Sequence, residues 1–219
     1  MPAGPPILCY VTDSGALPGG VAALPGVLRA ALRAGVDWVQ IREKHLPARP
    51  LAELTRAAAQ EARAAGKQSK ILVNDRLDVA LAAGADGVHL GGGSLPVAEV
   101  KAWLERERGR LKLAAGFLIG RSCHSLEEGQ QAERDGASYV IFGPVYATPS
   151  KAQFGEPQGI ERLREVCGAV RIPVLAIGGI TVENARACLQ AGAAGIAAIR
   201  MFQEASDLAL LLEALRGVK

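Results

Sequence analysis

Short apolar segments alternate along the chain with longer segments rich in Ala, Leu, Glu and Arg. Four of the apolar segments belong to a repeated phrase that starts with Gly35, Gly84, Gly136 and Gly192, which are 49, 52 and 56 residues apart (84−35, 136−84, 192−136). The glycine suits the end of a helix, where a positive φ is needed. The run after it is too apolar for a half-exposed strand. Each phrase therefore predicts a helix end followed by a parallel strand that is covered on both faces.

Four further apolar runs lie at 7–11, 70–74, 117–120 and 173–177, which gives eight predicted strands. Segments with helical composition lie between strands, at 51–65, 94–108, 125–135, 160–167 and 182–191. A (β/α)8 barrel of about 250 residues has roughly 30 residues in each strand–helix unit, so one repeat of the phrase corresponds to two units. We predict an α/β protein, a (β/α)8 TIM barrel in which residues 1–219 form a single domain. An open doubly wound sheet is the alternative.

The composition of the chain excludes several classes of protein. The net charge is only +3, and the Lys and Arg residues are scattered among few aromatic ones, so we expect no nucleic-acid partner. No apolar stretch approaches the length of a membrane span, and no signal peptide is recognisable, which predicts a cytoplasmic protein without a membrane partner. The four cysteines are too widely spaced for a zinc site or a disulfide scaffold. The oligomeric state stays open, with a homo-oligomer as one option.

The active site of such a barrel forms where the strands end. The second strand ends in Gln40, Arg42 and Lys44, which alternation places on one side. Two cations and an amide at a barrel mouth predict an anionic substrate, although a surface charge cluster is the alternative. The third strand ends in Asn74 and Asp75. This pair suits Mg2+ bridged to substrate phosphates, or else the N-cap of the next helix.

Two histidines lie near the ends of the fourth and fifth strands. His89 fits a core histidine with a satisfied ring as well as a functional one. Ser94, followed by a proline, predicts the N-cap of the next helix. Ser125 and Glu128 form a capping-box pattern, which places His124 at a strand-to-helix turn. A histidine there is suited to general acid–base catalysis, and a structural role is the alternative.

The sixth strand is followed by the longest connection that we predict, and long connections in compact domains are often functional lids. Within it, Thr148, Ser150 and Lys151 offer hydroxyls and a cation to a phosphate group.

The last two strands end in Gly178-Gly179 and Ile199-Arg200. These two loops form the usual phosphate site of such barrels, where backbone N–H groups bind the anion and a glycine pair permits close approach. The sequence therefore predicts small phosphorylated substrates.

Taken together, six motifs resemble the thiamin phosphate synthase and thiazole tautomerase family. They lie at 39–44 (VQIREK), 73–76 (VNDR), 87–91 (GVHLG), 122–124 (SCH), 142–151 (FGPVYATPSK) and 177–180 (IGGI). The resemblance runs in order from about Tyr10 to Phe202. It implies a (β/α)8 fold and, for the synthase, coupling of hydroxymethylpyrimidine diphosphate to thiazole phosphate with release of pyrophosphate.

The resemblance also implies roles for individual residues. Those expected to hold the pyrimidine diphosphate are Gln40, Arg42, Lys44, Asn74 and Lys151. Asp75 is expected to bind Mg2+ as the metal cofactor. Ser122, Thr148 and Ser150 are expected to line the active site, with Ser122, Lys151 and His124 as the catalytic candidates. Gly179, with Gly178 beside it, and the backbone of Ile199 and Arg200 are expected to hold the thiazole phosphate.

One departure from the family pattern leaves two activities open. Synthases usually carry a Gln and an Asp where this chain has Gly92 and Ser94, and that Asp is the second carboxylate on Mg2+. The tautomerase branch also lacks this carboxylate and uses a histidine at the position of His124. The chain nevertheless keeps the diphosphate-binding set, for which a tautomerase has no use. We therefore predict a synthase, with the tautomerase as the alternative, and we disfavour a non-catalytic regulator that binds thiazole phosphate.

Overall fold

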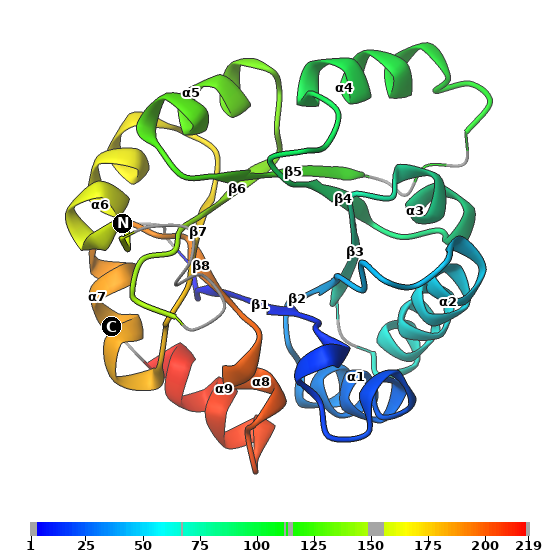
Figure 1. Ribbon diagram of the computed structural model, residues 1–219, viewed down its shortest axis with the longest axis horizontal. Coiled ribbons are helices and arrows are strands. Elements are labelled where there is room, and N and C mark those ends of the chain that lie inside the picture. The colour runs from blue at the N-terminus through cyan, green and yellow to red at the C-terminus, as the bar shows by residue number, and fades with distance from the viewer. Residues whose placement is uncertain (1–3, 67, 112, 114–115, 149–155, 218–219) are drawn as a thin grey trace.

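A computed structural model of the protein describes residues 4–66, 68–111, 113, 116–148 and 156–217. Its eight strands pair in parallel and in chain order, and β8 closes against β1 to complete a barrel (Figure 1). The strands are β1 (Ile7–Val11), β2 (Trp38–Ile41), β3 (Lys70–Asn74), β4 (Gly87–Leu90), β5 (Leu118–Cys123), β6 (Tyr139–Phe142), β7 (Val174–Ile177) and β8 (Gly195–Ala198). The predicted TIM barrel is confirmed, and the open sheet is excluded.

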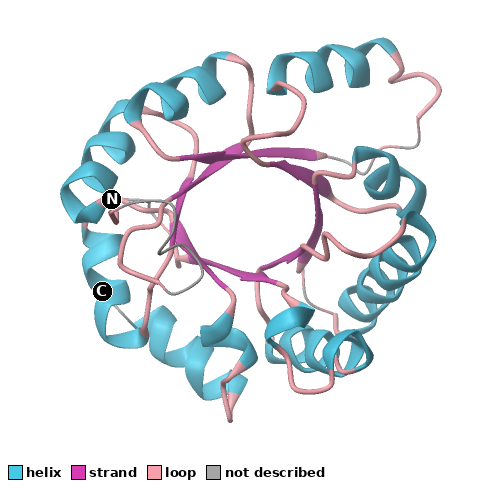
Figure 2. Cartoon of the chain, viewed as in Figure 1, coloured by secondary structure: helices cyan, strands magenta, loops and turns pink. Residues whose placement is uncertain are grey.

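The helices form a ring outside the barrel (Figure 2). They are α1 (Leu24–Ala34), α2 (Ala48–Ala64), α3 (Leu77–Ala83), α4 (Val97–Arg106), α5 (Leu126–Arg134), α6 (Gly159–Ala169), α7 (Val182–Gln190), α8 (Arg200–Gln203) and α9 (Leu208–Gly217), with 3-10 turns η1 (Ser14–Ala16) and η2 (Gly20–Ala22). Helix α1 shows why they pack inward, because Leu24, Leu28, Ala31 and Leu32 share one buried stripe. Within the described ranges, no helix has the length and apolar character that a membrane span requires.

The glycine of each repeated phrase ends a helix with a positive φ, as predicted. Gly35 and Gly84 are the C-caps of α1 and α3, with φ of 97° and 67°. Gly136 and Gly192 follow α5 and α7 with φ of 89° and 105°. A residue with a Cβ is strained in this conformation, so the repeat in the sequence records a repeated backbone requirement.

The residue two positions after each glycine binds the strand next to it. The backbone N–H groups of Asp37, Asp86, Ser138 and Ala194 donate to the carbonyls of Leu8, Ile71, Ile119 and Val174 over 3.1, 2.7, 2.7 and 2.8 Å. At three of the four positions the side chain also accepts from the N–H of the same partner. These pairs are Asp37 with Leu8 (2.9 Å), Asp86 with Ile71 (2.7 Å) and Ser138 with Ile119 (3.0 Å). Each such two-way contact, which we call a strand clamp, fixes the register between neighbouring strands.

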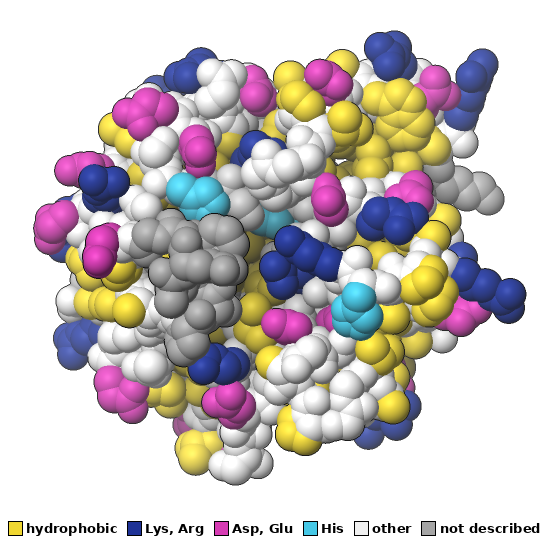
Figure 3. All heavy atoms as spheres, viewed as in Figure 1, with side chains coloured by type: hydrophobic (Ala, Val, Ile, Leu, Met, Phe, Trp, Pro, Cys, Tyr) yellow, Lys and Arg dark blue, Asp and Glu magenta, His cyan; other side chains and the backbone are white. Residues whose placement is uncertain are grey.

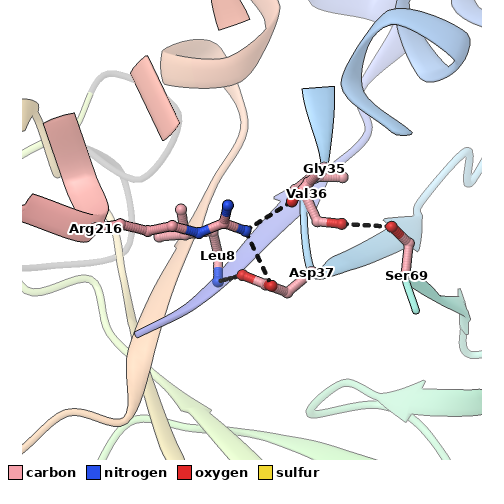
Figure 4. A network of polar contacts seen from close by, with 6 residues as sticks. All are labelled: Leu8, Gly35, Val36, Asp37, Ser69 and Arg216. Carbon is pink, nitrogen blue, oxygen red and sulfur yellow. Dashed lines mark hydrogen bonds and ion pairs between the residues drawn. The ribbon is translucent and has the colours of Figure 1, made fainter. Parts of the chain in front are cut away.

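The first strand clamp also holds the last helix (Figure 4). Arg216 of α9 donates to the carbonyl of Gly35 over 2.7 Å and to Asp37 over 3.1 Å. Ser69, just before β3, donates to the carbonyl of Val36 over 2.6 Å. The start of β2 therefore joins the C-terminal helix to the first three strands.

The interior of the barrel is apolar along most of the strands and polar at their C-terminal ends. The apolar part is formed by Cys9, Val11, Leu72, Tyr139, Ile141, Leu175 and Ala197. Further along β2, β3, β4 and β5, the inward positions are Gln40, Asn74, His89 and Ser122. This change from apolar to polar side chains marks the mouth of the barrel as the end that can bind a polar ligand.

Strand β5 is longer than the sequence predicted. We expected it to end at Gly120, but it continues to Cys123 and therefore carries Ser122 within the strand. Gly120 lies within the strand because the Tyr139 ring occupies the place of a side chain there. A Cβ at Gly120 would lie 2.1 Å from that ring. Here the missing side chain makes room for a neighbouring ring inside the barrel.

We expect loss of one strand clamp to lower stability measurably. Asp86→Ala leaves the Ile71 N–H without its acceptor, which should reduce the free energy of unfolding by about 1–3 kcal/mol. Urea denaturation measures this change. Glu53→Ala is the control, since it removes only an exposed pair with Arg49 and should cost less than about 0.5 kcal/mol. Equal losses in the two variants would show that the clamp contributes no more than a surface pair.

Candidate active site

Side chains from neighbouring loops join around the mouth of the barrel. In Figure 3, Lys or Arg, His and Asp or Glu side chains all lie near the centre of this face. The contacts that connect the strand ends are Thr12–Glu43 (2.6 Å), Gln40–Asn74 (3.0 Å), His89–Ser122 (2.9 Å), Arg121–Gly91 O (2.6 Å), His124–Gly143 O (2.5 Å), Arg200–Thr148 (3.3 Å) and Gln203–Asp13 O (2.9 Å). The strand ends singled out from the sequence therefore meet at one end of the molecule.

The ends of β2 and β3 are joined through two of the predicted residues. The amide of Gln40, which is only 2% exposed, donates to Asn74. Arg42 is half-buried, and its backbone N–H donates to the Thr12 hydroxyl over 2.9 Å. Lys44 lies beyond the strand and is exposed. A cluster of surface charges does not describe this arrangement, because Gln40 is buried and Arg42 is partly so.

Asp75 occupies an unusual backbone conformation. Its φ is +66°, the only positive φ among the described residues other than glycine. Its N–H donates to the carbonyl of His89 over 2.8 Å, and its side chain is exposed. The N-cap alternative is wrong, because Arg76 is the N-cap residue of α3 and makes no side-chain cap. Strained non-glycine residues gather at functional sites, which supports a functional role for this carboxylate.

Glu43 is a buried carboxylate that sequence reasoning missed. It is 3% exposed and accepts hydrogen bonds from Thr12 Oγ1 and from the N–H and hydroxyl of Ser14. Its three donors hold the segment after β1 against the end of β2, beside Arg42. The alternation predicted from the sequence runs to Lys44 and so places Glu43 on the side opposite Arg42, but β2 ends at Ile41 and the alternation stops there.

His89 is buried with both ring nitrogens in hydrogen-bond contact. Nδ1 lies 3.1 Å from the hydroxyl of Tyr139, and Nε2 lies 2.9 Å from Ser122 Oγ. Burial, with further contributions from the charges of Arg121 and Arg42, lowers the pKa of His89 to about 3. The ring is therefore neutral near pH 7, and both of its nitrogens have partners, as expected for the first of the two alternatives left open for His89.

His124 lies at the turn between β5 and α5, as predicted. Its ring is exposed, and Nδ1 donates to the carbonyl of Gly143 over 2.5 Å. Because a carbonyl can only accept, Nδ1 carries a proton, which leaves Nε2 of the neutral ring able to accept one. The capping box is only half formed. Ser125 accepts from the Glu128 N–H, but the Glu128 carboxylate accepts from the N–H of His124 instead of that of Ser125.

Ser94 does not cap α4, which corrects the prediction. The N-cap residue is Pro96, and the Ser94 hydroxyl accepts from the Gly91 N–H over 2.7 Å. A short turn that closes on itself competes here with the helix for the hydroxyl. Arg121, a second residue that the sequence analysis missed, donates to the carbonyl of Gly91 and ties this turn to β5.

The glycine pair after β7 is required by the protein itself. Gly178 and Gly179 have φ of 97° and 62°. A Cβ on Gly178 would lie 2.5 Å from Pro144, and one on Gly179 would lie 2.5 Å from the carbonyl oxygen of Ala147. The sequence predicts that the pair permits close approach of a phosphate, and packing against the loop after β6 also requires glycine at both positions.

The remaining predicted residues are only partly placed. Arg200 begins α8 directly after its N-cap residue Ile199, and its guanidinium donates to Thr148 over 3.3 Å. The loops after β8 and β6 are therefore in contact. Ser150 and Lys151 lie outside the described residues.

The described residues contain no group of three His, Cys, Asp or Glu side chains that could enclose a metal ion. Asp75 supplies one exposed carboxylate at the mouth. Mg2+ keeps several waters and can be held by one or two carboxylates together with substrate phosphates. The donor set therefore fits Mg2+ that arrives with a phosphorylated ligand and does not fit a metal caged by protein alone.

A family model and several relatives match nearly the whole chain. The model of the family described as thiamine monophosphate synthase matches residues 8–202. A thiamine-phosphate synthase of Roseiflexus castenholzii is 42% identical over 206 residues, which are 94% of this chain and 85% of that protein. One of Moorella thermoacetica is 41% identical over 209 residues, covering 95% and 94%. A solved thiamine phosphate pyrophosphorylase from Pyrococcus furiosus superposes with a TM-score of 0.80 at 35% identity, covering 97% of this chain and 95% of that one.

The pKa of His89 predicts a loss of stability in acid. Unfolding returns the ring to its ordinary pKa of 6.5, so below that pH the unfolded state binds a proton that the native state does not. Stability should therefore fall as the pH drops from about 6.5 towards 3. At pH 5 the buried neutral ring should lower the free energy of unfolding by about 2 kcal/mol. Urea unfolding at pH 7 and pH 5 measures it, and the pH dependence should be weaker in His89→Gln. An equal dependence in both proteins would contradict a neutral buried ring.

Proposed function

Because the chain belongs to the thiamine monophosphate synthase family, we propose that it couples hydroxymethylpyrimidine diphosphate to thiazole phosphate and releases pyrophosphate. The observation that carries this proposal is the meeting of the β2 and β3 ends at one mouth, where Gln40 bonds Asn74 next to Arg42 and Asp75. The relatives compared above carry synthase names and match nearly the whole chain. This favours coupling over the tautomerase alternative.

The ends of β2 and β3 are suited to bind the diphosphate. Arg42 can bind phosphate oxygens through two N–H groups, and exposed Lys44 adds a point charge. Glu43, bonded to Thr12 and Ser14, holds the backbone between these two cations in place. Gln40 and Asn74 orient each other beneath the cations. Lys151 is proposed to add a further cation from the loop after β6.

Asp75 is proposed to hold Mg2+ together with the substrate diphosphate. The bound ion would neutralise charge on the leaving pyrophosphate. Ser94 is a weaker ligand than a carboxylate, and its hydroxyl is already used by Gly91. Asp75 therefore stands as the single carboxylate proposed for the metal in this chain.

The reaction exchanges one bond for another. The C–O bond between the pyrimidine methylene and the diphosphate breaks with both electrons leaving on pyrophosphate. The thiazole nitrogen then supplies the electron pair for the new C–N bond. Because the pyrimidine ring stabilises the intermediate cation, the main task of the protein is to stabilise the leaving group, and Arg42, Lys44 and Lys151 are the cations proposed for this role. Ser122 and His124 are proposed to line the reacting centre.

The thiazole phosphate is proposed to bind at the loops after β7 and β8. The backbone at Gly178-Gly179 faces the loop after β6, which in turn contacts Arg200 through Thr148. Backbone N–H groups here, with those of Ile199 and Arg200, are suited to an anion. Ser150 is proposed to contribute a hydroxyl from the same side.

Two substitutions separate coupling from tautomerisation. If coupling is the reaction, Asp75→Asn should nearly abolish thiamin phosphate formation, because it removes the one strong Mg2+ ligand, and His124→Ala should have a modest effect. A tautomerase would show the reverse, with a loss of about 10²- to 10⁴-fold for His124→Ala. Steady-state assays with both substrate sets measure these effects. Wild-type protein that converts the thiazole carboxylate precursor but forms no thiamin phosphate at saturating Mg2+ would refute the proposal.

Metal dependence gives a gain-of-function test. Chelation of Mg2+ should stop coupling, and titration of the metal back should restore it. Ser94→Asp adds the second carboxylate, so it should lower the Mg2+ concentration that gives half-maximal rate, since ligand charge strengthens binding of a hard cation. Ser94→Asn is the matched control, because it has nearly the same shape without the charge. An identical Mg2+ requirement in all three proteins would place the metal away from the turn after β4.

A further inference from the structure

One chain of hydrogen bonds runs from the packed barrel interior to the mouth. It starts at the hydroxyl of Tyr139, passes through the His89 ring and ends at Ser122 Oγ, with contacts of 3.1 Å at Nδ1 and 2.9 Å at Nε2. Tyr139 and His89 are buried, whereas Ser122 is partly exposed. The three residues come from β6, β4 and β5 and lie 33 and 50 positions apart along the sequence.

Tyr139 determines which nitrogen of His89 donates and which accepts in this chain of hydrogen bonds. A neutral imidazole has one N–H, so one nitrogen donates and the other accepts. Among the described residues, the Tyr139 hydroxyl makes its hydrogen bond to His89 alone. A proton on Nδ1 would leave the buried Tyr139 O–H without an acceptor, at a cost of about 1–3 kcal/mol. Nδ1 must therefore accept from Tyr139, and the ring proton lies on Nε2 and is donated to Ser122.

We propose that Tyr139 and His89 are positioning residues that orient the Ser122 hydroxyl as a hydrogen-bond donor toward the bound substrate. Ser122 Oγ accepts from His89, so its own proton points away from the ring. Its oxygen makes no other hydrogen bond within the described part of the chain. The proton is therefore available to an acceptor atom with a lone pair on the ligand.

The packing around Tyr139 keeps the donor in place. Its ring fills the space left by Gly120, and the ring of Trp38 meets it edge-on with centroids 4.7 Å apart. The phenol therefore cannot turn to another acceptor without displacing both neighbours. A donor fixed before the ligand arrives costs no reorganisation when the ligand binds.

The tautomer of His89 can be read directly by 15N NMR on histidine-labelled protein. The chain has three histidines, and His89→Gln identifies the signals of His89. We expect the proton on Nε2 in the ligand-free wild-type protein near pH 7. In Tyr139→Phe the preference should weaken, because neither tautomer then satisfies both nitrogens. A proton on Nδ1 in the wild type, or a ring unchanged in Tyr139→Phe, would overturn the proposal.

Kinetics test whether the orientation serves catalysis, a step that rests on the proposed function. Tyr139→Phe keeps the packing and should lower kcat/KM about tenfold, which corresponds to about 1.4 kcal/mol. In the Ser122→Ala background the same change should have no further effect, since Tyr139 acts through Ser122. Additive losses would overturn the proposal.

Tyr10→Phe is the matched control. It removes a buried hydroxyl that lies beside Gln203 and makes no hydrogen bond to His89 or Ser122, and it should leave both the His89 signals and kcat/KM unchanged. Equal losses in Tyr10→Phe and Tyr139→Phe would reduce the role of Tyr139 to packing, against the proposal. If the wild type forms no thiamin phosphate, the proposed function fails, while the NMR result still decides the tautomer.

Discussion

The strand clamps are the contacts on which the barrel geometry depends. A parallel strand can slide by two residues and still place the same side chains inward, so apolar pattern alone does not fix its register. Asp37, Asp86 and Ser138 remove this freedom by binding both backbone groups of one residue in the preceding strand. Once the starts of the strands are fixed, their ends are fixed too, and the mouth residues are brought into hydrogen-bond range.

The glycine before each clamp links helix to strand. It ends the helix with a positive φ, so that the next two residues can turn into the barrel wall. The fourth copy of the phrase has Ala194 in place of an acceptor and keeps only the backbone bond to Val174. The clamp side chain is therefore dispensable at β8, where Gly195 allows close approach to β1, since a Cβ there would lie 2.1 Å from the Ile7 carbonyl oxygen.

The apolar interior of the barrel stabilises the fold, and the polar mouth carries the groups proposed to bind the substrate. The apolar part below the mouth excludes water, and His89 lies at its boundary with a pKa lowered to about 3. Burial there keeps the ring neutral. A neutral ring accepts from the Tyr139 hydroxyl at one nitrogen and donates to the Ser122 hydroxyl from the other. At the ends of β2 and β3 lie the half-buried Arg42 and the exposed Asp75, whose backbone has a positive φ. The change from apolar to polar side chains along the strands therefore both forms the core and sets the hydrogen bonds at the mouth.

Much of the site could be predicted from the sequence, since a barrel brings strand ends together and Gln40, Asn74, Ser122 and His124 follow apolar runs. Arg121 was missed because we predicted that β5 ends at Gly120, whereas the strand runs on to Cys123. Glu43 was missed because it lies beyond the end of β2. Past the last residue of a strand the alternation of side chains stops, so partners in three dimensions decide which way a side chain points. Glu43 is buried because Thr12 and Ser14 offer it donors from another loop.

The sequence by itself determined the eight strands, the helix ends and the family, because these follow from periodicity, glycine spacing and motifs of neighbouring residues. Only the tertiary structure decided how the polar groups pair. Ser94 turned back to Gly91 instead of capping α4, and the glycine pair at 178–179 proved to be required by the loop after β6. The tautomer of His89 depends on Tyr139, 50 residues away. Such pairings depend on register and burial across strands, which no local pattern of residues contains.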